Sequence, residues 1–190
     1  SLGEGVFAGS GLTSIVIPSS VTSIGDRAFE LCTSLTSVTI PSSVTSIGSY
    51  IFQDCTDLTN IKIHDRITSI GSNAFNNSGL ISITIPESVI SIADDTFVNC
   101  SSLTSIIFDG NAPTFGTDIF TGSDSVTVYY DSNNSGWSST VVGRPAVDAN
   151  LFVLLGERDA ALEAQASAEA ERDAKLTLDE VKDLRAGSTM

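Results

Sequence analysis

Basic residues are scarce in this chain. Nine lysines and arginines stand against 23 aspartates and glutamates, which gives a formal net charge of −14 at pH 7 and a pI near 4.1. A charge of this sign and size repels a phosphate backbone or an anionic membrane surface. We therefore do not expect nucleic acid to be a partner of this protein.

Long apolar runs are missing as well. The longest compact run, residues 151–155, has five apolar residues, whereas a membrane-spanning helix needs about 18 or more. The sequence therefore predicts no insertion into a membrane. It opens at Ser1 in mid-pattern without a signal peptide, and we interpret it as a piece of a longer protein.

Residue types that bind metals or act in catalysis are few. There are three cysteines, Cys32, Cys55 and Cys100, without the CxxC spacing of a zinc site, and one histidine, His64, in a predicted turn. The acidic pair Asp94 and Asp95 lacks the alternating acidic pattern of a calcium loop. We expect no cofactor, no metal site and no catalytic residues, so the chain is predicted not to be an enzyme.

The sequence is rich in internal repetition. A phenylalanine recurs at intervals of 22 or 23 residues, and two further ladders of apolar residues keep the same period. Because one unit has too few apolar side chains to fold alone, such units must stack into a solenoid. The phenylalanine ladder consists of Phe7, Phe29, Phe52, Phe75, Phe97 and Phe120.

Each unit contains a short strand followed by a turn. Val38, Thr39 and Ile40 alternate between apolar and polar, which is typical of a strand with one buried face. The proline that follows, Pro41 in this unit, ends the strand because it lacks a backbone donor. Phe29 and its equivalents, each with the residue before it, are predicted to form a single helical or 3₁₀ turn that fills the core.

The best-preserved unit, residues 24–46, reads IGDRAFELCTSLTSVTIPSSVTS. It closely resembles the BspA-like leucine-rich repeats, a family of cell-surface proteins, and the resemblance covers residues 2 to about 130. The resemblance implies a right-handed leucine-rich-repeat solenoid of short parallel strands, a location at the cell surface or outside the cell, and adhesion in some members. It carries over no catalytic residues.

The cysteines occupy one equivalent position of three repeat units. We interpret Cys32, Cys55 and Cys100 as free buried thiols. The alternative is a disulfide between Cys32 and Cys55, which lie in adjacent units; Cys100 is two units beyond Cys55 and cannot reach it.

Composition divides the chain into three regions. Residues 1–108 are the regular solenoid, residues 109–147 a degenerate last repeat and C-terminal cap, and residues 148–190 an α-helical tail rich in alanine and glutamate. In the cap, Trp137 with Tyr129 or Tyr130 is expected to cover the last unit, although the same aromatic residues are also typical of a sugar-binding platform.

The tail carries a short repeat of its own. The segment Glu-Arg-Asp-Ala begins at Glu157 and again at Glu171, a spacing of two heptads. Such a tail is either a helical spacer or a weak coiled coil through which the protein self-associates.

The outward positions of the predicted main sheet are the candidate binding face, because solenoids usually bind through a sheet face. On one interpretation the chain is an adhesion module that recognises an extracellular protein or glycan there. On the other it is a passive structural spacer, and the serines and threonines are generic exposed strand residues. The candidate positions are Ser14, Val16, Ser37, Thr39, Asn60, Lys62, Ser82, Thr84, Ser105 and Ile107.

Overall fold

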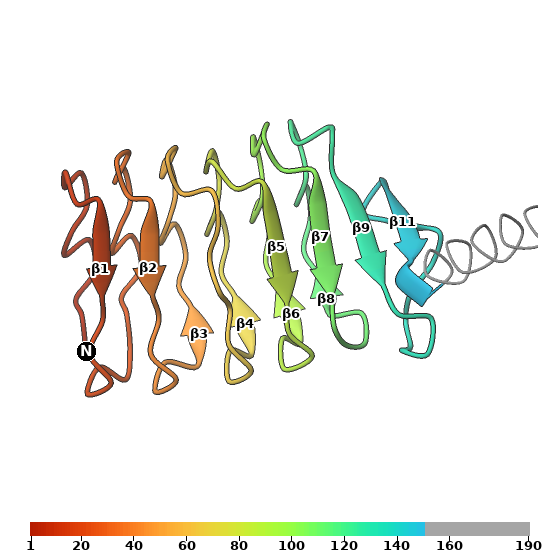
Figure 1. Ribbon diagram of the computed structural model, residues 1–190, viewed down its shortest axis with the longest axis horizontal. Coiled ribbons are helices and arrows are strands. Elements are labelled where there is room, and N and C mark those ends of the chain that lie inside the picture. Colours follow the sequence, from red (N-terminus) through yellow and green to blue (C-terminus); the bar gives the residue numbers. More distant parts are fainter. Residues whose placement is uncertain (151–190) are drawn as a thin grey trace, which may run out of the picture. The chain divides into compact units, whose positions relative to one another are not determined.

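A computed structural model describes residues 1–150 of the chain, and the regular elements of this part are short β-strands that stand side by side along one axis (Figure 1). These residues include no helix with the length and apolar character needed to cross a bilayer. The strands are β1 (Ser14–Val16), β2 (Ser37–Thr39), β3 (Ser46–Ile47), β4 (Ser69–Ile70), β5 (Ser82–Ile85), β6 (Ser91–Ile92), β7 (Ser105–Phe108), β8 (Thr114–Phe115), β9 (Thr127–Tyr130), β10 (Thr140–Val141) and β11 (Arg144–Asp148).

The front sheet contains one strand from each of most turns. Strands β1 and β2 pair in parallel, and so do β5, β7, β9 and β11, while β10 runs antiparallel to β11 at the end. The register advances by one repeat unit per strand, so Ser82 lies opposite Ser105 and Ser105 opposite Thr127. The predicted stack of short parallel strands is therefore confirmed.

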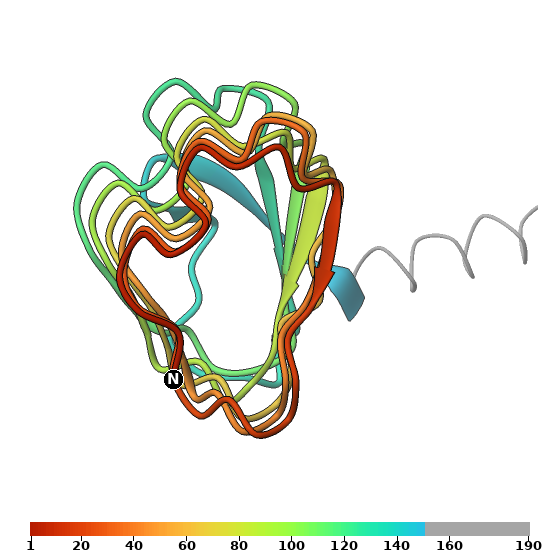
Figure 2. The ribbon, with the colours of Figure 1, turned by 90° about the vertical axis from the view of Figure 1, so that its left-hand side faces the viewer.

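The back sheet holds the opposite side of the turns together. It runs in the order β3, β4, β6, β8 without interruption, and Ile47, Ile70, Ile92 and Phe115 lie next to one another in it. Viewed along the stack, successive turns follow nearly the same outline (Figure 2). Equivalent positions of the repeat therefore lie above one another around the whole turn.

The phenylalanine ladder forms the centre of the core. Rings of successive units stack with centroids 5.4, 5.5, 5.6, 5.4 and 6.0 Å apart and with interplanar angles of 16° or less. Phe29, Phe52, Phe75 and Phe97 are fully buried. Each ring thus fills the space above its predecessor, which is why the repeat retains this one residue type in all six units.

The prediction of a helical or 3₁₀ turn at these phenylalanines is wrong: residues 1–148 contain neither kind of helix. Arg27 and Leu31 on either side of Phe29 have φ near +60°, a conformation that stops a right-handed helix. The N–H groups of Phe29 and Leu31 donate to the next turn, at Ile51 O and Gln53 O, instead of to their own turn. Paired β-turns replace the helix because stacking supplies the backbone partners that a helix would otherwise provide.

Aromatic side chains close the C-terminal end of the stack. Trp137 stacks on Tyr130 with ring centroids 5.1 Å apart, lies 4.9 Å from Phe108, and donates its indole N–H to Gly110 O at 3.0 Å. Arg144 of β11 donates to Phe120 O at 2.7 Å. This packing supports the interpretation as a cap, which stays a prediction. The predicted helical tail and coiled coil lie almost wholly in residues 151–190, outside the described part.

Candidate binding face

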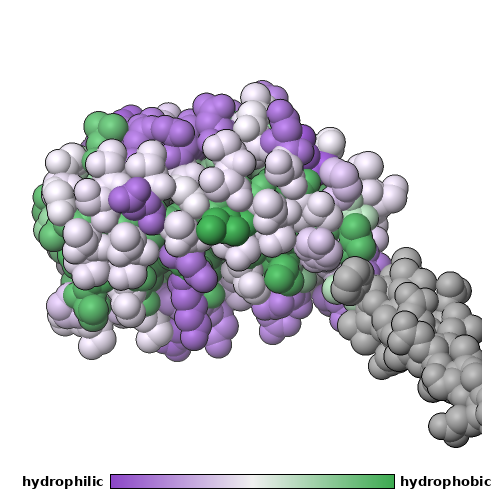
Figure 3. Space-filling model, turned by 45° about the horizontal axis from the view of Figure 1, so that its top comes forward, coloured by the Kyte–Doolittle hydropathy of each residue, from purple (hydrophilic) through white to green (hydrophobic). Residues whose placement is uncertain are grey.

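The ten predicted positions, here called the front row, lie on the outer side of the front sheet. Eight of them are exposed, and Ser82 and Ser105 are half-buried. They alternate with core residues such as Val38 and Ile83, as the two-residue period of a strand requires. The surface in this region is mostly of intermediate hydropathy, with small apolar and polar patches (Figure 3).

Sequence reasoning missed the continuation of the front row into the last repeat. Strand β9 pairs with β7 so that Thr127 lies beside Ser105 and Tyr129 beside Ile107. Both residues are half-buried. The alternation of residues 126–129 resembles that of the earlier strands, and aligning it with them would have added these two positions. From the sequence, Tyr129 or Tyr130 is expected in the cap and not in the front row.

The side chains of the front row are not used to hold the fold together. Several hydroxyls elsewhere bond to the preceding turn; those of Thr36, Thr68 and Thr104, for example, donate to backbone carbonyls at 2.9 to 3.2 Å. Within residues 1–150, no front-row side chain donates a hydrogen bond to the preceding turn, and none forms an ion pair. Their polar groups therefore remain available to a ligand.

The front sheet is interrupted at the third turn. Residues 60–63 form no strand, although Ile61 and Ile63 are only 5% and 7% exposed and point into the core as their equivalents do. Within the described residues, no backbone hydrogen bond joins residues 60–63 to β2 or to β5. In Figure 1 the chain passes between these two strands without an arrow. The peptide groups of this segment thus lack the partners that equivalent groups have elsewhere.

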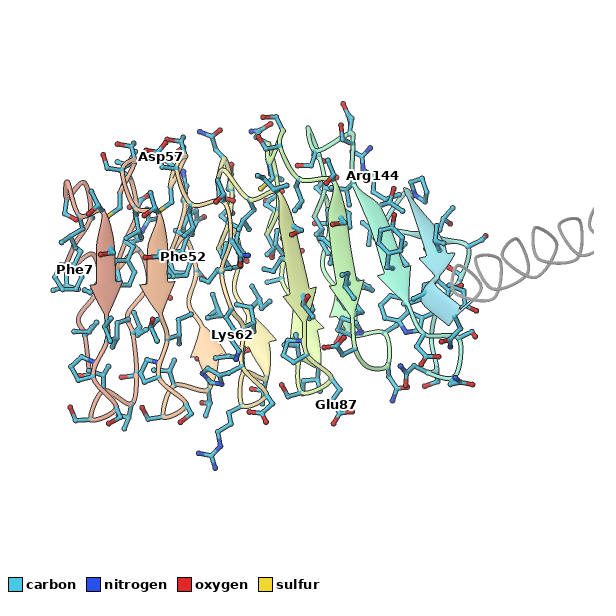
Figure 4. The ribbon with its side chains drawn as sticks, in the orientation of Figure 1. Phe7, Phe52, Asp57, Lys62, Glu87 and Arg144 are labelled. Carbon is cyan, nitrogen blue, oxygen red and sulfur yellow. The ribbon has the colours of Figure 1, made fainter. Side chains whose placement is uncertain are left out.

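Two hollows flank this segment. One, of about 370 Å³, is lined by residues 60–63, Ser82, Ile83, Thr84 and Asp109. The other, of about 280 Å³, lies on the β2 side. Lys62 borders both, and its position is labelled in Figure 4. The lining of the second hollow consists of Val38, Thr39, Ile40, Ser42, Lys62 and His64.

His64 replaces the proline that follows the strand in other units, and both of its ring nitrogens are engaged. The backbone N–H of Arg66 donates to Nδ1 at 3.2 Å, so the ring proton is on Nε2, which donates to Pro41 O at 3.1 Å. The imidazole therefore ties the third turn to the second. This bonding agrees with its interpretation as a turn residue.

The three cysteines are free and buried. The thiols of Cys32, Cys55 and Cys100 donate to the carbonyls of the phenylalanines one turn earlier at 3.0 to 3.2 Å. Burial raises the pKa of the Cys55 thiol from 9.0 to about 12, and Cys32 adds to the rise. Burial also raises the pKa of the Cys100 thiol. These groups act as protonated donors in the core, and the disulfide alternative does not hold.

The acidic pair Asp94 and Asp95 lies in a turn of the fifth unit. The Asp94 carboxylate accepts hydrogen bonds from the backbone N–H and the hydroxyl of Thr117, at 2.7 and 3.1 Å, and Asp95 has φ of +59° in a turn. Residues 1–150 hold no group of three or more side chains suited to a metal ion. Asp94 thus contributes to the contact between successive turns.

A family model described as the BspA type leucine-rich repeat region matches residues 1–127 in six copies. The chain belongs to the BspA-type leucine-rich repeat family. The match ends in β9, so the six copies of this BspA-type chain correspond to the six units of the phenylalanine ladder. No curated protein matches it.

Two solved leucine-rich repeat proteins are similar to this BspA-type chain. One, from Bacteroides ovatus, is 23% identical with a TM-score of 0.55, over 77% of this chain and 46% of that protein. The other, from T. pallidum, is 26% identical with a TM-score of 0.54, over 66% of this chain and 70% of that one. Both support the fold, and this chain spans less than half the length of the B. ovatus protein.

Proposed function

We propose that this chain is a non-catalytic binding or adhesion module, secreted or displayed at the cell surface, which recognises an extracellular protein or glycan through the front row. The observation that carries the proposal is a difference in hydrogen bonding between the front-row side chains and hydroxyls elsewhere on the stack. Some hydroxyls elsewhere on the stack, such as those of Thr36, Thr68 and Thr104, donate to the preceding turn, whereas no front-row hydroxyl does so within residues 1–150, and most of the front row is exposed. Membership of the BspA-type family supports a surface location.

The shape of the face favours broad contacts over a deep pocket. Thr39, Thr84 and their neighbours are short side chains on a sheet, and such a surface suits an extended ligand better than a small substrate. Both ring nitrogens of His64 are engaged by backbone groups, which supports a non-catalytic role. The alternative, a passive spacer, predicts that the front row has no ligand.

The test is binding of the purified chain to an array of extracellular proteins and glycans, compared with the double variant Thr39→Arg/Thr84→Arg. A matched control is Thr45→Arg/Ile90→Arg, because both of these residues are exposed, lie two turns apart, and lie outside the front row. We expect saturable binding that the front-row variant loses by at least about tenfold and the control retains. Equal binding by all three proteins would reject the front row, and no binding at all would favour the spacer.

A further inference from the structure

The interruption at residues 60–63 is the place where the front row changes chemistry. The other predicted positions of the row carry serine, threonine, valine or isoleucine, while the third turn carries Asn60 and Lys62. The backbone changes at the same place, since residues 60–63 lose their hydrogen bonds to both neighbouring strands. An unusual side chain, an unpaired backbone and two hollows therefore coincide.

Lys62 has no anionic partner within the described residues. This part of the chain holds four lysines and arginines, and two of them, Arg27 and Arg144, form ion pairs with carboxylates at 2.9 and 2.8 Å. Lys62 and Arg66 form none among residues 1–150. Of these two, only Lys62 borders the hollows. It places one positive charge without an ion-pair partner between two hollows that are lined by both polar and aliphatic side chains.

We propose that this interruption is a subsite for a glycan bearing a single carboxylate, with the carboxylate on Lys62 and neighbouring sugar rings in the two hollows. The inference rests on the proposed function and names a ligand class for it. Asn60, Ser82 and Thr84 offer donors and acceptors for sugar hydroxyls, and the carboxylate of Asp109, which also lines the larger hollow, would accept from them. A charge-assisted hydrogen bond to Lys62 would fix the orientation of the acidic sugar.

Other ligand classes fit these observations less well. An added peptide strand needs an open sheet edge, but residues 60–63 still occupy the space between β2 and β5, with Ile61 and Ile63 buried. A polyanion would meet one lysine on a chain of net charge −14. A ligand with one carboxylate and several neutral hydroxyls matches a site with one lysine, hydroxyl and amide side chains and an aliphatic lining.

The test uses the 190-residue chain with 3′-sialyllactose as the acidic probe and its methyl ester as the uncharged match, with affinities measured by NMR titration. We expect the acid to bind at least about fivefold more tightly than the ester at low salt. Lys62→Gln should remove this difference between acid and ester. Arg66→Gln is the matched control, because it removes the other unpaired cation outside the hollows, and it should leave both affinities unchanged.

Several results would overturn the subsite. These are no binding of the acid, equal binding of acid and ester by the wild type, or the same loss in Arg66→Gln as in Lys62→Gln. A poly-glutamate peptide that displaces the acid and binds more tightly would replace the glycan with an acidic protein segment. Circular dichroism checks that each variant folds. If sialyllactose fails while an array ligand is still blocked by Thr39→Arg/Thr84→Arg, the subsite is wrong and the proposed function stands.

Discussion

At the scale of single residues, the turns of this protein depend on left-handed backbone positions. Each of the first six units has two such positions four residues apart, and the second is occupied by Gly9, Leu31, Asp54, Asn77, Asn99 and Gly122. Glycine, asparagine and aspartate tolerate positive φ, whereas leucine does so poorly. Leu31, with φ of +59° and a side chain 52% exposed, is the exception.

Leu31→Asn should therefore stabilise the fold, by about 1 kcal/mol in the free energy of unfolding, because the short polar side chain of asparagine can hydrogen-bond to the nearby backbone and so offsets the cost of positive φ. Urea unfolding followed by circular dichroism measures the change. Leu31→Ala is the control, since it removes the leucine side chain but supplies no polar group to bond to the backbone at positive φ, and it should give little or no gain. A loss of stability in Leu31→Asn would mean that leucine contributes more by packing than it costs by strain.

At the scale of elements, three features connect successive turns: the front sheet, the back sheet and the stack of phenylalanine rings. The front sheet is less continuous than the other two. The back sheet passes without a break through β3, β4, β6 and β8, and the phenylalanine stack runs through all six units. The front sheet is broken at the third turn. Packing of Phe52 in the core should therefore contribute strongly to the stability of this turn.

Phe52→Ala should cost about 3 to 5 kcal/mol of unfolding free energy, the usual range for a buried phenylalanine. Its ring is fully buried and lies 5.5 and 5.6 Å from Phe29 and Phe75. Phe7→Ala is the matched comparison, because Phe7 is half-buried and stacks on Phe29 alone, and we expect less than half the loss. Chemical denaturation of both variants decides this, and equal losses would show that the stack is not the source of the stability.

At the scale of the whole molecule, stacked units are coupled mainly to their neighbours. Trp137, the single tryptophan, packs in the last turns against Phe108 and Tyr130. It therefore reports on the C-terminal end of the solenoid, far along the sequence from the third turn.

If coupling between neighbours extends along the stack, Phe52→Ala should lower the midpoint of the Trp137 fluorescence transition as much as that of the far-ultraviolet circular dichroism transition. Both signals are followed in one urea titration of the wild type and the variant. Coincident midpoints indicate one cooperative unit. A Trp137 transition that stays at the wild-type midpoint would contradict this, and it would mean that the repeats on the two sides of the third turn unfold independently.

The repeat period alone predicts most of the fold and the location of the candidate face. An interval of 22 or 23 residues, with Val38 and Ile40 alternating with Thr39, specifies the parallel register, and register alone decides which side chains share a face. The helical turn at Phe29 was predicted wrongly because single-sequence patterns do not show that Phe29 N–H bonds to the next turn. Thr127 and Tyr129 were missed because the last repeat is degenerate.

The sequence by itself thus determined the solenoid, its buried ladders and the outward row, because these follow from periodicity and burial. Only the tertiary structure decided which hydroxyls hold the turns together and which are free, since Thr36 and Thr39 are the same residue type in one strand region and differ only in what lies beside them. It also decided that the front sheet opens at Lys62. Backbone pairing depends on distances between turns, which a sequence pattern does not encode.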